Sequence, residues 1–256
     1  MDNSTTGSNT ADSLRHHPGP APALIFLHGW CCDGADWEQQ IAHFKGRHEI
    51  LAPDLPGHGQ TPAGHPEADN IPQLAKQALA VLAAAKSHKA VLIGHSMGGP
   101  VALEMAARQT DRVAAVVLVD SFLIDYGGMS KSTIERLGTA FDGDFSKAME
   151  NMVERSCGAR ASATLKKAIL DKMRSMDADR ARRLWKAMVQ WDPRSAFHHG
   201  QAPIHAINSP LVADSTRQRL ASLMSETIIP DSGHFIHREC PELFNQALSD
   251  ALHQVM

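Results

Sequence analysis

Short, continuous apolar runs alternate with amphipathic stretches along this chain. The runs lie at residues 23–27, 50–52, 90–93, 113–119, 203–207 and 227–229. A run of this length that is apolar throughout is typical of a strand buried on both faces of a parallel sheet. Helical periodicity appears between the runs, as at residues 74–85 and 100–109. The alternation predicts an α/β fold, in which a mostly parallel central sheet carries helices on both faces.

The strand signals stop between residue 121 and about residue 200, and helical patterns replace them. Apolar side chains within residues 145–153 recur at helical spacing, and Asp177 is placed to cap a further helix. The first 20 residues are polar, rich in Ser, Thr, Asn, Gly and Pro, and lack periodicity. We therefore expect a disordered lead-in at 1–20, an α/β core at 21–120 and 201–256, and a helical cap insertion at 121–200.

A Gly-x-Ser-x-Gly motif follows directly on the third apolar run. Residues 94–99 read Gly-His-Ser-Met-Gly-Gly and lead into a predicted helix. A sharp turn from strand to helix holds the serine in a strained backbone, and the small flanking residues let the chain pack closely. The Met97 N–H then lies at a helix N-terminus, where it can stabilise an oxyanion. Ser96 is therefore the candidate nucleophile.

Two further motifs support a family resemblance. Residues 28–30 read His-Gly-Trp after the first run, and residues 54–59 read Asp-Leu-Pro-Gly-His-Gly after the second. With the serine motif, they make the chain resemble the α/β-hydrolase superfamily from about residue 23 to its C-terminal end. The resemblance implies that Trp30 supplies the second oxyanion N–H beside Met97. It also implies that His28 braces this loop and that residues 54–59 form a structural turn.

A histidine is needed to activate the serine, because a serine hydroxyl is a poor nucleophile at neutral pH. Gly233, His234 and Phe235 follow the last apolar run. They resemble the Gly-His-Phe loop that carries the general base in the superfamily. His237 falls on the first turn of the following helix, where we expect a surface side chain. The pattern therefore predicts His234 as the base.

The acid that orients this histidine departs from the usual superfamily pattern. Members commonly place Asp a few residues beyond the next-to-last strand, where this chain has Leu211. Asp120 closes the apolar run at 113–119, as in haloalkane dehalogenases and cofactor-independent quinolone dioxygenases, which take their acid from this strand. Ligand chemistry lies at such strand ends, and a partly buried carboxylate needs a partner such as His234. We favour Asp120, with Asp214 as the alternative acid, although Asp214 also fits a helix N-cap.

These residues together predict a carboxylesterase-like serine hydrolase that acts on a small, apolar or aromatic ester through an acyl-enzyme. The Met and Trp content of the insertion favours such a substrate. The same residues can also serve a cofactor-independent C–C hydrolase, a perhydrolase or a quinolone-type dioxygenase. A ligand receptor built on the hydrolase fold is a further alternative. Epoxide hydrolases and dehalogenases are disfavoured, because they use Asp at the position of Ser96.

Composition and charge narrow the expected partners to a small-molecule substrate. The 256 residues carry a formal net charge of -3 without a block of like charges, so neither nucleic acid nor an anionic membrane is an expected partner. The chain lacks a signal-peptide pattern and any run of about 18 apolar residues, so we expect a cytoplasmic protein of undetermined oligomeric state. Neither the four cysteines nor the histidines follow a disulfide or metal-binding pattern, and no cofactor is expected.

Overall fold

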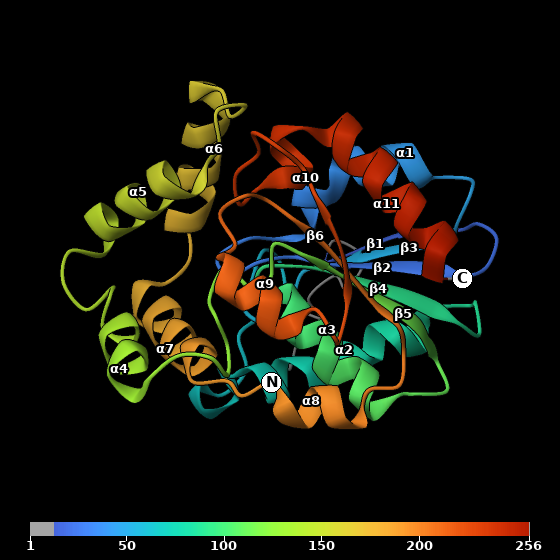
Figure 1. Ribbon diagram of the computed structural model, residues 1–256, viewed down its shortest axis with the longest axis horizontal. Coiled ribbons are helices and arrows are strands. Elements are labelled where there is room, and N and C mark those ends of the chain that lie inside the picture. The colour runs from blue at the N-terminus through green and yellow to red at the C-terminus, as the bar shows by residue number, and fades with distance from the viewer. Residues whose placement is uncertain (1–12, 256) are drawn as a thin grey trace, which may run out of the picture.

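A seven-stranded sheet forms the centre of the computed structural model, which describes residues 13–255 (Figure 1). The strands are β1 (Leu14–His17), β2 (Ala23–Leu27), β3 (Ile50–Pro53), β4 (Ala90–His95), β5 (Val113–Val119), β6 (Ile204–Asn208) and β7 (Ser225–Ile228). Their order in the sheet is β1-β3-β2-β4-β5-β6-β7, and every pair is parallel except β1 with β3. The predicted α/β fold with a mostly parallel sheet is confirmed.

Helices cover both faces of this sheet. Those outside the β5–β6 connection are η1 (Gly34–Trp37), α1 (Glu38–Phe44), η2 (Pro66–Ala68), α2 (Ile71–Ala84), α3 (Gly98–Arg108), α9 (Asp214–Leu220), α10 (Ile236–Glu239) and α11 (Pro241–Val255). Alternate residues of β2 join two separate cores: Ile25 packs in the core with α2 and α3, and Phe26 in the core with α1 and α11. This two-sided burial explains why the strand is apolar throughout. No helix within residues 13–255 is long and apolar enough to cross a membrane.

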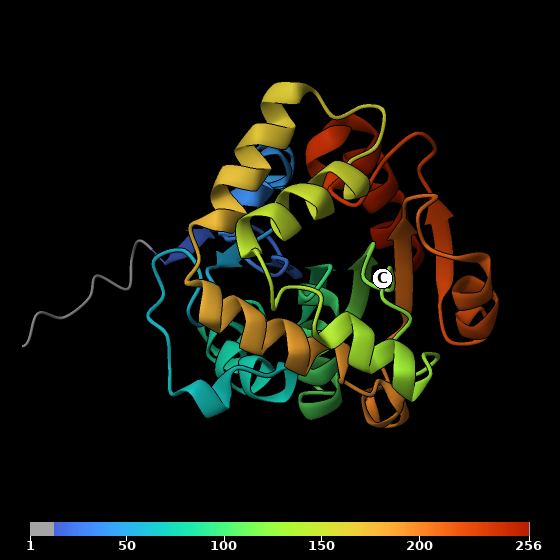
Figure 2. The ribbon, with the colours of Figure 1, turned by 90° about the vertical axis from the view of Figure 1, so that its left-hand side faces the viewer.

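Five helices occupy the connection from β5 to β6, and we call them the helical segment. They are α4 (Lys131–Gly138), α5 (Phe145–Ser156), α6 (Ala163–Arg174), α7 (Ala178–Val189) and α8 (Arg194–His199). Asp177 accepts a hydrogen bond from the Arg180 N–H at the start of α7, so its predicted capping role is confirmed. Figure 1 shows α4 to α7 together on the left-hand side of the molecule, and Figure 2 looks onto that side. The long insertion thus folds as helices, as its periodicity indicates.

The edge strand β1 corrects the prediction that residues 1–20 are disordered. β1 pairs antiparallel with β3, and Arg15 donates a hydrogen bond of 2.9 Å to Asp54 Oδ1. The prediction was wrong for Leu14–His17, because polar contacts with a neighbouring strand hold these residues in place. The partner of Arg15 lies 39 positions further along the chain, so the local sequence does not reveal the contact. Residues 1–12 lie outside the described part of the chain.

Glu49, next to the start of β3, has a carboxylate that the fold depends on at neutral pH. It is 2 % exposed and accepts hydrogen bonds from the N–H groups of Lys86 (2.9 Å) and Ser87 (2.7 Å), and its Oε1 lies 2.9 Å from His16 Nε2. Burial alone would raise the pKa of this carboxyl group, but the hydrogen bonds lower it from 4.5 to about 2. Its stabilising contribution is therefore present above the ordinary pKa and is lost as the pH falls toward the folded-state pKa.

We expect Glu49→Gln to lower the free energy of unfolding by about 1–3 kcal/mol near pH 7, because the buried N–H groups lose their charged acceptor. The difference from wild type should shrink as the pH is lowered from about 5 to about 3. Urea denaturation at several pH values measures both effects. Glu67→Gln is the control, since that side chain is 91 % exposed. A loss that is equal at all pH values would contradict the prediction.

Candidate active site

Ser96 occupies a tight turn between β4 and α3. Its φ of 51° lies in the left-handed region, and its N–H donates to the Val119 carbonyl at 3.0 Å. A Cβ at Gly94 would lie 2.3 Å from the Gly98 carbonyl oxygen, and a Cβ at Gly98 would lie 2.2 Å from the Leu27 carbonyl oxygen. Both positions therefore require glycine. The strand–turn–helix context predicted for the serine motif is confirmed.

Asp120 and His234 are in direct contact, although 114 positions separate them. His234 Nδ1 donates to Asp120 Oδ2 at 2.7 Å, and Asp120 Oδ1 accepts the Ser209 N–H at 2.7 Å. Asp120 is fully buried. Because Nδ1 of the neutral ring holds the proton, Nε2 is left as a proton acceptor. Asp214 instead lies on the first turn of α9 with a side chain that is 80 % exposed, where it pairs with Arg217.

Two backbone N–H groups beside Ser96 have no acceptor within residues 13–255. They belong to Trp30 and Met97, which are 3 % and 0 % exposed. The loop of Trp30 lies against the serine turn, since a Cβ at Gly29 would be 3.3 Å from Ser96 Cβ. Buried N–H groups without a partner are rare in folded proteins. Such a pair beside a nucleophile can donate hydrogen bonds to a developing oxyanion.

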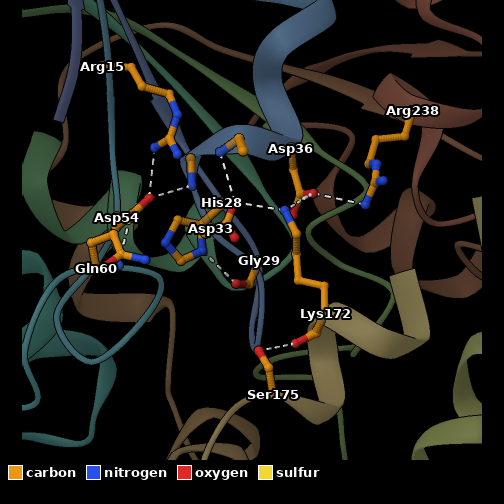
Figure 3. A network of polar contacts seen from close by, with 12 residues as sticks. Arg15, His28, Gly29, Asp33, Asp36, Asp54, Gln60, Lys172, Ser175 and Arg238 are labelled. Carbon is orange, nitrogen blue, oxygen red and sulfur yellow. Dashed lines mark hydrogen bonds and ion pairs between the residues drawn. The ribbon is translucent and has the colours of Figure 1, made fainter. Parts of the chain in front are cut away.

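The side chains of His28 and Asp54 hold the loop that carries Trp30, as Figure 3 shows. His28 Nε2 accepts the Leu55 N–H at 2.8 Å, so its Nδ1 donates to the Gly29 carbonyl, also at 2.8 Å. Burial lowers the pKa of His28, which favours the neutral ring, and the two hydrogen bonds select this tautomer. Asp54 Oδ1 accepts the Gly34 N–H of this loop at 2.8 Å, and Asp54 Oδ2 accepts the Gln60 N–H at 2.9 Å. The contacts of both residues are those of a brace, as the sequence resemblance implies.

A cavity of about 100 Å³ joins the strand ends to the helical segment. Ser96 and His234 both line the cavity. Within the described residues no hydrogen bond joins their side chains, and catalytic hydrogen bonds are often long when no substrate is bound. The apolar wall of the cavity includes Leu123, Ile124, Tyr126, Met152, Met173, Trp185 and Met188. Neither Lys nor Arg lines the cavity. Within residues 13–255, no group of three His, Cys, Asp or Glu side chains is arranged to hold a metal ion.

His237 corrects the expectation of a surface side chain. It is 1 % exposed, and its ring stacks on Trp37 with 4.3 Å between ring centroids. Burial and the neighbouring charge of Arg238 lower the pKa of His237 well below its usual value. The expectation was wrong because α10 turns this side chain into the core, which the local sequence does not reveal. His237 does not line the cavity, whereas His234 does.

Glu239 is a residue of this site that the sequence analysis missed. Its Oε2 accepts the N–H groups of Gly233 at 2.8 Å and Gly158 at 2.9 Å, and its Oε1 accepts the Phe235 N–H at 3.1 Å. One carboxylate therefore holds both neighbours of His234 and the end of α5. The only signal in the sequence is an acidic residue five positions after the histidine. Its meaning depends on Gly158, which lies far away along the chain.

Comparison with known proteins agrees with this geometry. The family model described as the alpha/beta hydrolase family matches residues 24–247. The chain belongs to the alpha/beta hydrolase family.

Similar proteins include curated enzymes and a solved structure. The pimeloyl-[acyl-carrier protein] methyl ester esterase of Vibrio atlanticus is 36 % identical over 112 residues, which are 43 % of this chain and 41 % of that protein. The biotin biosynthesis bifunctional protein of Cellvibrio japonicus is 26 % identical over 90 % of this chain and 47 % of its own length. The chain thus aligns with less than half the length of either relative. An esterase from Thermogutta terrifontis shares the fold, with a TM-score of 0.80, 22 % identity and coverage of 94 % and 93 %.

We expect Glu239→Gln to lower the free energy of unfolding by about 1–3 kcal/mol, because an amide cannot accept hydrogen bonds at both of its terminal atoms. Chemical denaturation measures this loss. The matched control is Glu242→Gln, an exposed carboxylate three residues further on. Equal stability of the two variants would show that the Glu239 carboxylate does not hold the loop.

Proposed function

We propose that this hydrolase cleaves carboxylic esters, with Ser96 as nucleophile, His234 as general base and Asp120 as the acid that orients it. The observation that carries the proposal is the 2.7 Å hydrogen bond from His234 Nδ1 to Asp120 Oδ2, at a cavity that Ser96 also lines. This bond leaves Nε2 of the neutral ring as an acceptor for the serine proton. The constellation therefore contains the three groups that acyl transfer to serine requires.

In the proposed mechanism, Ser96 Oγ attacks the ester carbonyl carbon while His234 Nε2 takes the hydroxyl proton. The carbonyl oxygen becomes an oxyanion, which accepts hydrogen bonds from the N–H groups of Trp30 and Met97. The tetrahedral intermediate expels the alcohol, which receives the proton from His234, and leaves Ser96 acylated. Water, deprotonated by His234, then attacks the acyl group, and the acid leaves as Ser96 regains its proton.

The names of similar proteins support an ester as the substrate. The Vibrio atlanticus relative is named as a methyl ester esterase, and the Thermogutta terrifontis structure is that of an esterase. We take from these names only the reaction they share, because this chain aligns with 41 % of the former and is 22 % identical to the latter. The proposal extends to carboxylic esters as a class and not to a carrier-protein substrate.

We further propose that the helical segment is a cap that selects a neutral, short acyl group. Four of its apolar side chains line the cavity, namely Met152, Met173, Trp185 and Met188. The cavity of about 100 Å³ is smaller than typical small-molecule pockets of about 300–1,000 Å³. Its methionine side chains are flexible, so the wall can adapt to small differences in acyl shape.

The proposed roles predict the effects of three substitutions on the hydrolysis of aryl and alkyl esters of graded acyl length. Ser96→Ala should lower kcat by more than about 10³-fold, because the nucleophile is removed. Asp120→Asn should lower kcat by on the order of 10³–10⁴-fold, because the amide favours the wrong histidine tautomer. Asp214→Asn should leave activity close to that of wild type, since Asp214 lies on the surface.

This set of variants decides among the proposed roles. Loss of activity in Asp214→Asn alone would exclude Asp120 as the acid. Full activity in Ser96→Ala would exclude the acyl-enzyme. Failure of wild type to hydrolyse any ester would exclude ester hydrolysis and favour carbon–carbon cleavage or oxygenation on the same scaffold.

The cap proposal predicts that Met152→Ala widens the acyl preference. Removal of this side chain enlarges the cavity, so kcat/KM for hexanoate relative to acetate should rise by about tenfold. Met224→Ala is the matched control, because Met224 lines a different cavity beside α9. Steady-state kinetics with the two p-nitrophenyl esters measures the ratio. An equal ratio in wild type and Met152→Ala would show that α5 does not limit acyl length.

A further inference from the structure

The loop that carries Trp30 makes direct contacts with the helical segment. We call residues 28–37 the oxyanion loop. The Trp30 indole Nε1–H donates to the Ala181 carbonyl on α7 at 3.0 Å. The next residue, Cys31, approaches Met176 between α6 and α7, with 3.4 Å between the two sulfur atoms. The position of this loop therefore depends on helices that begin more than 130 residues later in the chain.

Lys172 on α6 anchors the other half of the oxyanion loop (Figure 3). Its Nζ donates to Asp33 Oδ1 at 2.7 Å and to Asp36 Oδ1 at 2.8 Å. The Asp36 side chain is 3 % exposed, and its Oδ1 also accepts Arg238 Nη1 at 2.9 Å. Burial alone would lower the pKa of Lys172, but Asp36 and Asp33 raise it above its ordinary value, so the side chain is a stable cation.

Asp36 joins the three parts of the site that must act together. It belongs to the oxyanion loop, Lys172 to the helical segment, and Arg238 to the helix that starts two residues after His234. Ion pairs with a buried partner are screened less by solvent than surface pairs, so these contacts can hold geometry. A shift of α6 would move the oxyanion loop relative to the serine turn and the histidine.

The Trp30 side chain transmits such a shift to the backbone N–H. Its ring packs against Trp185 and Phe141, with centroids 5.0 and 4.8 Å away, and both belong to the helical segment or its loops. A buried side chain held by aromatic packing and a hydrogen bond has little freedom to move independently of its neighbours. The Trp30 N–H thus follows the helical segment.

We propose that Lys172 is a positioning residue of the oxyanion hole, whose ion pairs to Asp33 and Asp36 fix the helical segment against the oxyanion loop and so aim the Trp30 N–H at the reacting carbonyl oxygen. The helical segment then completes the oxyanion hole in addition to covering the cavity. This inference rests on the proposed ester hydrolysis. It assigns Lys172 no contact with the substrate.

The test compares an ester with its thionoester, in which sulfur replaces the carbonyl oxygen. The sulfur anion accepts hydrogen bonds more weakly, so wild type should prefer the ester, and a misplaced oxyanion N–H should reduce that preference. We expect Lys172→Met to lower kcat for the ester by at least about fivefold, with little change in KM and a smaller ester-to-thionoester ratio. Lys172→Arg should restore most of the ratio.

Lys166→Met is the matched control. Lys166 lies on the same helix, is 27 % exposed compared with 23 % for Lys172, and pairs with Glu154 on α5 instead of the oxyanion loop. The ester-to-thionoester ratio of Lys166→Met should equal that of wild type. If Lys172→Met fails to fold by circular dichroism, Asp33→Asn is used, because it removes one ion pair and keeps the oxygen that caps η1.

An ester-to-thionoester ratio of Lys172→Met equal to that of wild type would overturn the inference and leave ester hydrolysis intact. The same ratio change in Lys166→Met would also overturn it, because any loss of charge on α6 would then suffice. Failure of wild type to hydrolyse the ester would overturn the proposed function, and the role of Lys172 with it.

Discussion

The hydrogen bond between His234 and Asp120 is the interaction on which the rest of the site depends. Asp120 is fully buried at the end of an apolar strand, where a carboxyl group is costly unless its oxygens have donors. Both oxygens have one, from the His234 ring and the Ser209 N–H. The loop after β7 is thereby attached to the end of β5, which is the neighbour of the strand that delivers Ser96. The order of strands thus brings together groups that are distant along the chain.

The sheet topology explains how Asp120, the proposed acid, can follow β5 and still reach the loop of His234. β5 and β6 are adjacent, and the Asp120 N–H donates to the Ile207 carbonyl at 3.0 Å, so the turns after the two strands face the same region. At the position where the superfamily commonly has its Asp, Leu211 is 41 % exposed. The turn after β6 still contributes, because the Ser209 N–H binds Asp120. In this chain, the turn therefore supplies a hydrogen-bond donor to the proposed acid.

The strands and the serine turn could be predicted because their signals are local. A buried strand is indicated by an apolar run between turn residues. The serine turn is indicated by Gly94 and Gly98, because only glycine fits the close approach of the backbone at these positions. The elements that sequence reasoning missed depend on distant partners. Arg15 of β1 is held by the Asp54 carboxylate, and the buried ring of His237 stacks on Trp37. The Glu239 carboxylate joins two segments only because it accepts the distant Gly158 N–H. A polar residue whose partner lies far along the chain produces no periodic pattern in the sequence, so patterns alone could not reveal these contacts.

The charges around the cavity fit stabilisation of the transition state by dipoles. Lys172 pairs with Asp33 and Asp36, Arg238 also pairs with Asp36, and Arg180 pairs with Asp69, so these cations are held by carboxylates outside the cavity. Their ion pairs maintain the packing of the helical segment, and neither Lys nor Arg lines the cavity. The cavity is lined mainly by apolar side chains, so its effective dielectric constant is low. Fixed N–H dipoles therefore stabilise a charge that develops on a carbonyl oxygen more strongly there than in water. This arrangement fits the proposed neutral ester substrate, because the negative charge of such an ester arises only as the reaction proceeds and no Lys or Arg in the cavity favours an anionic ground state.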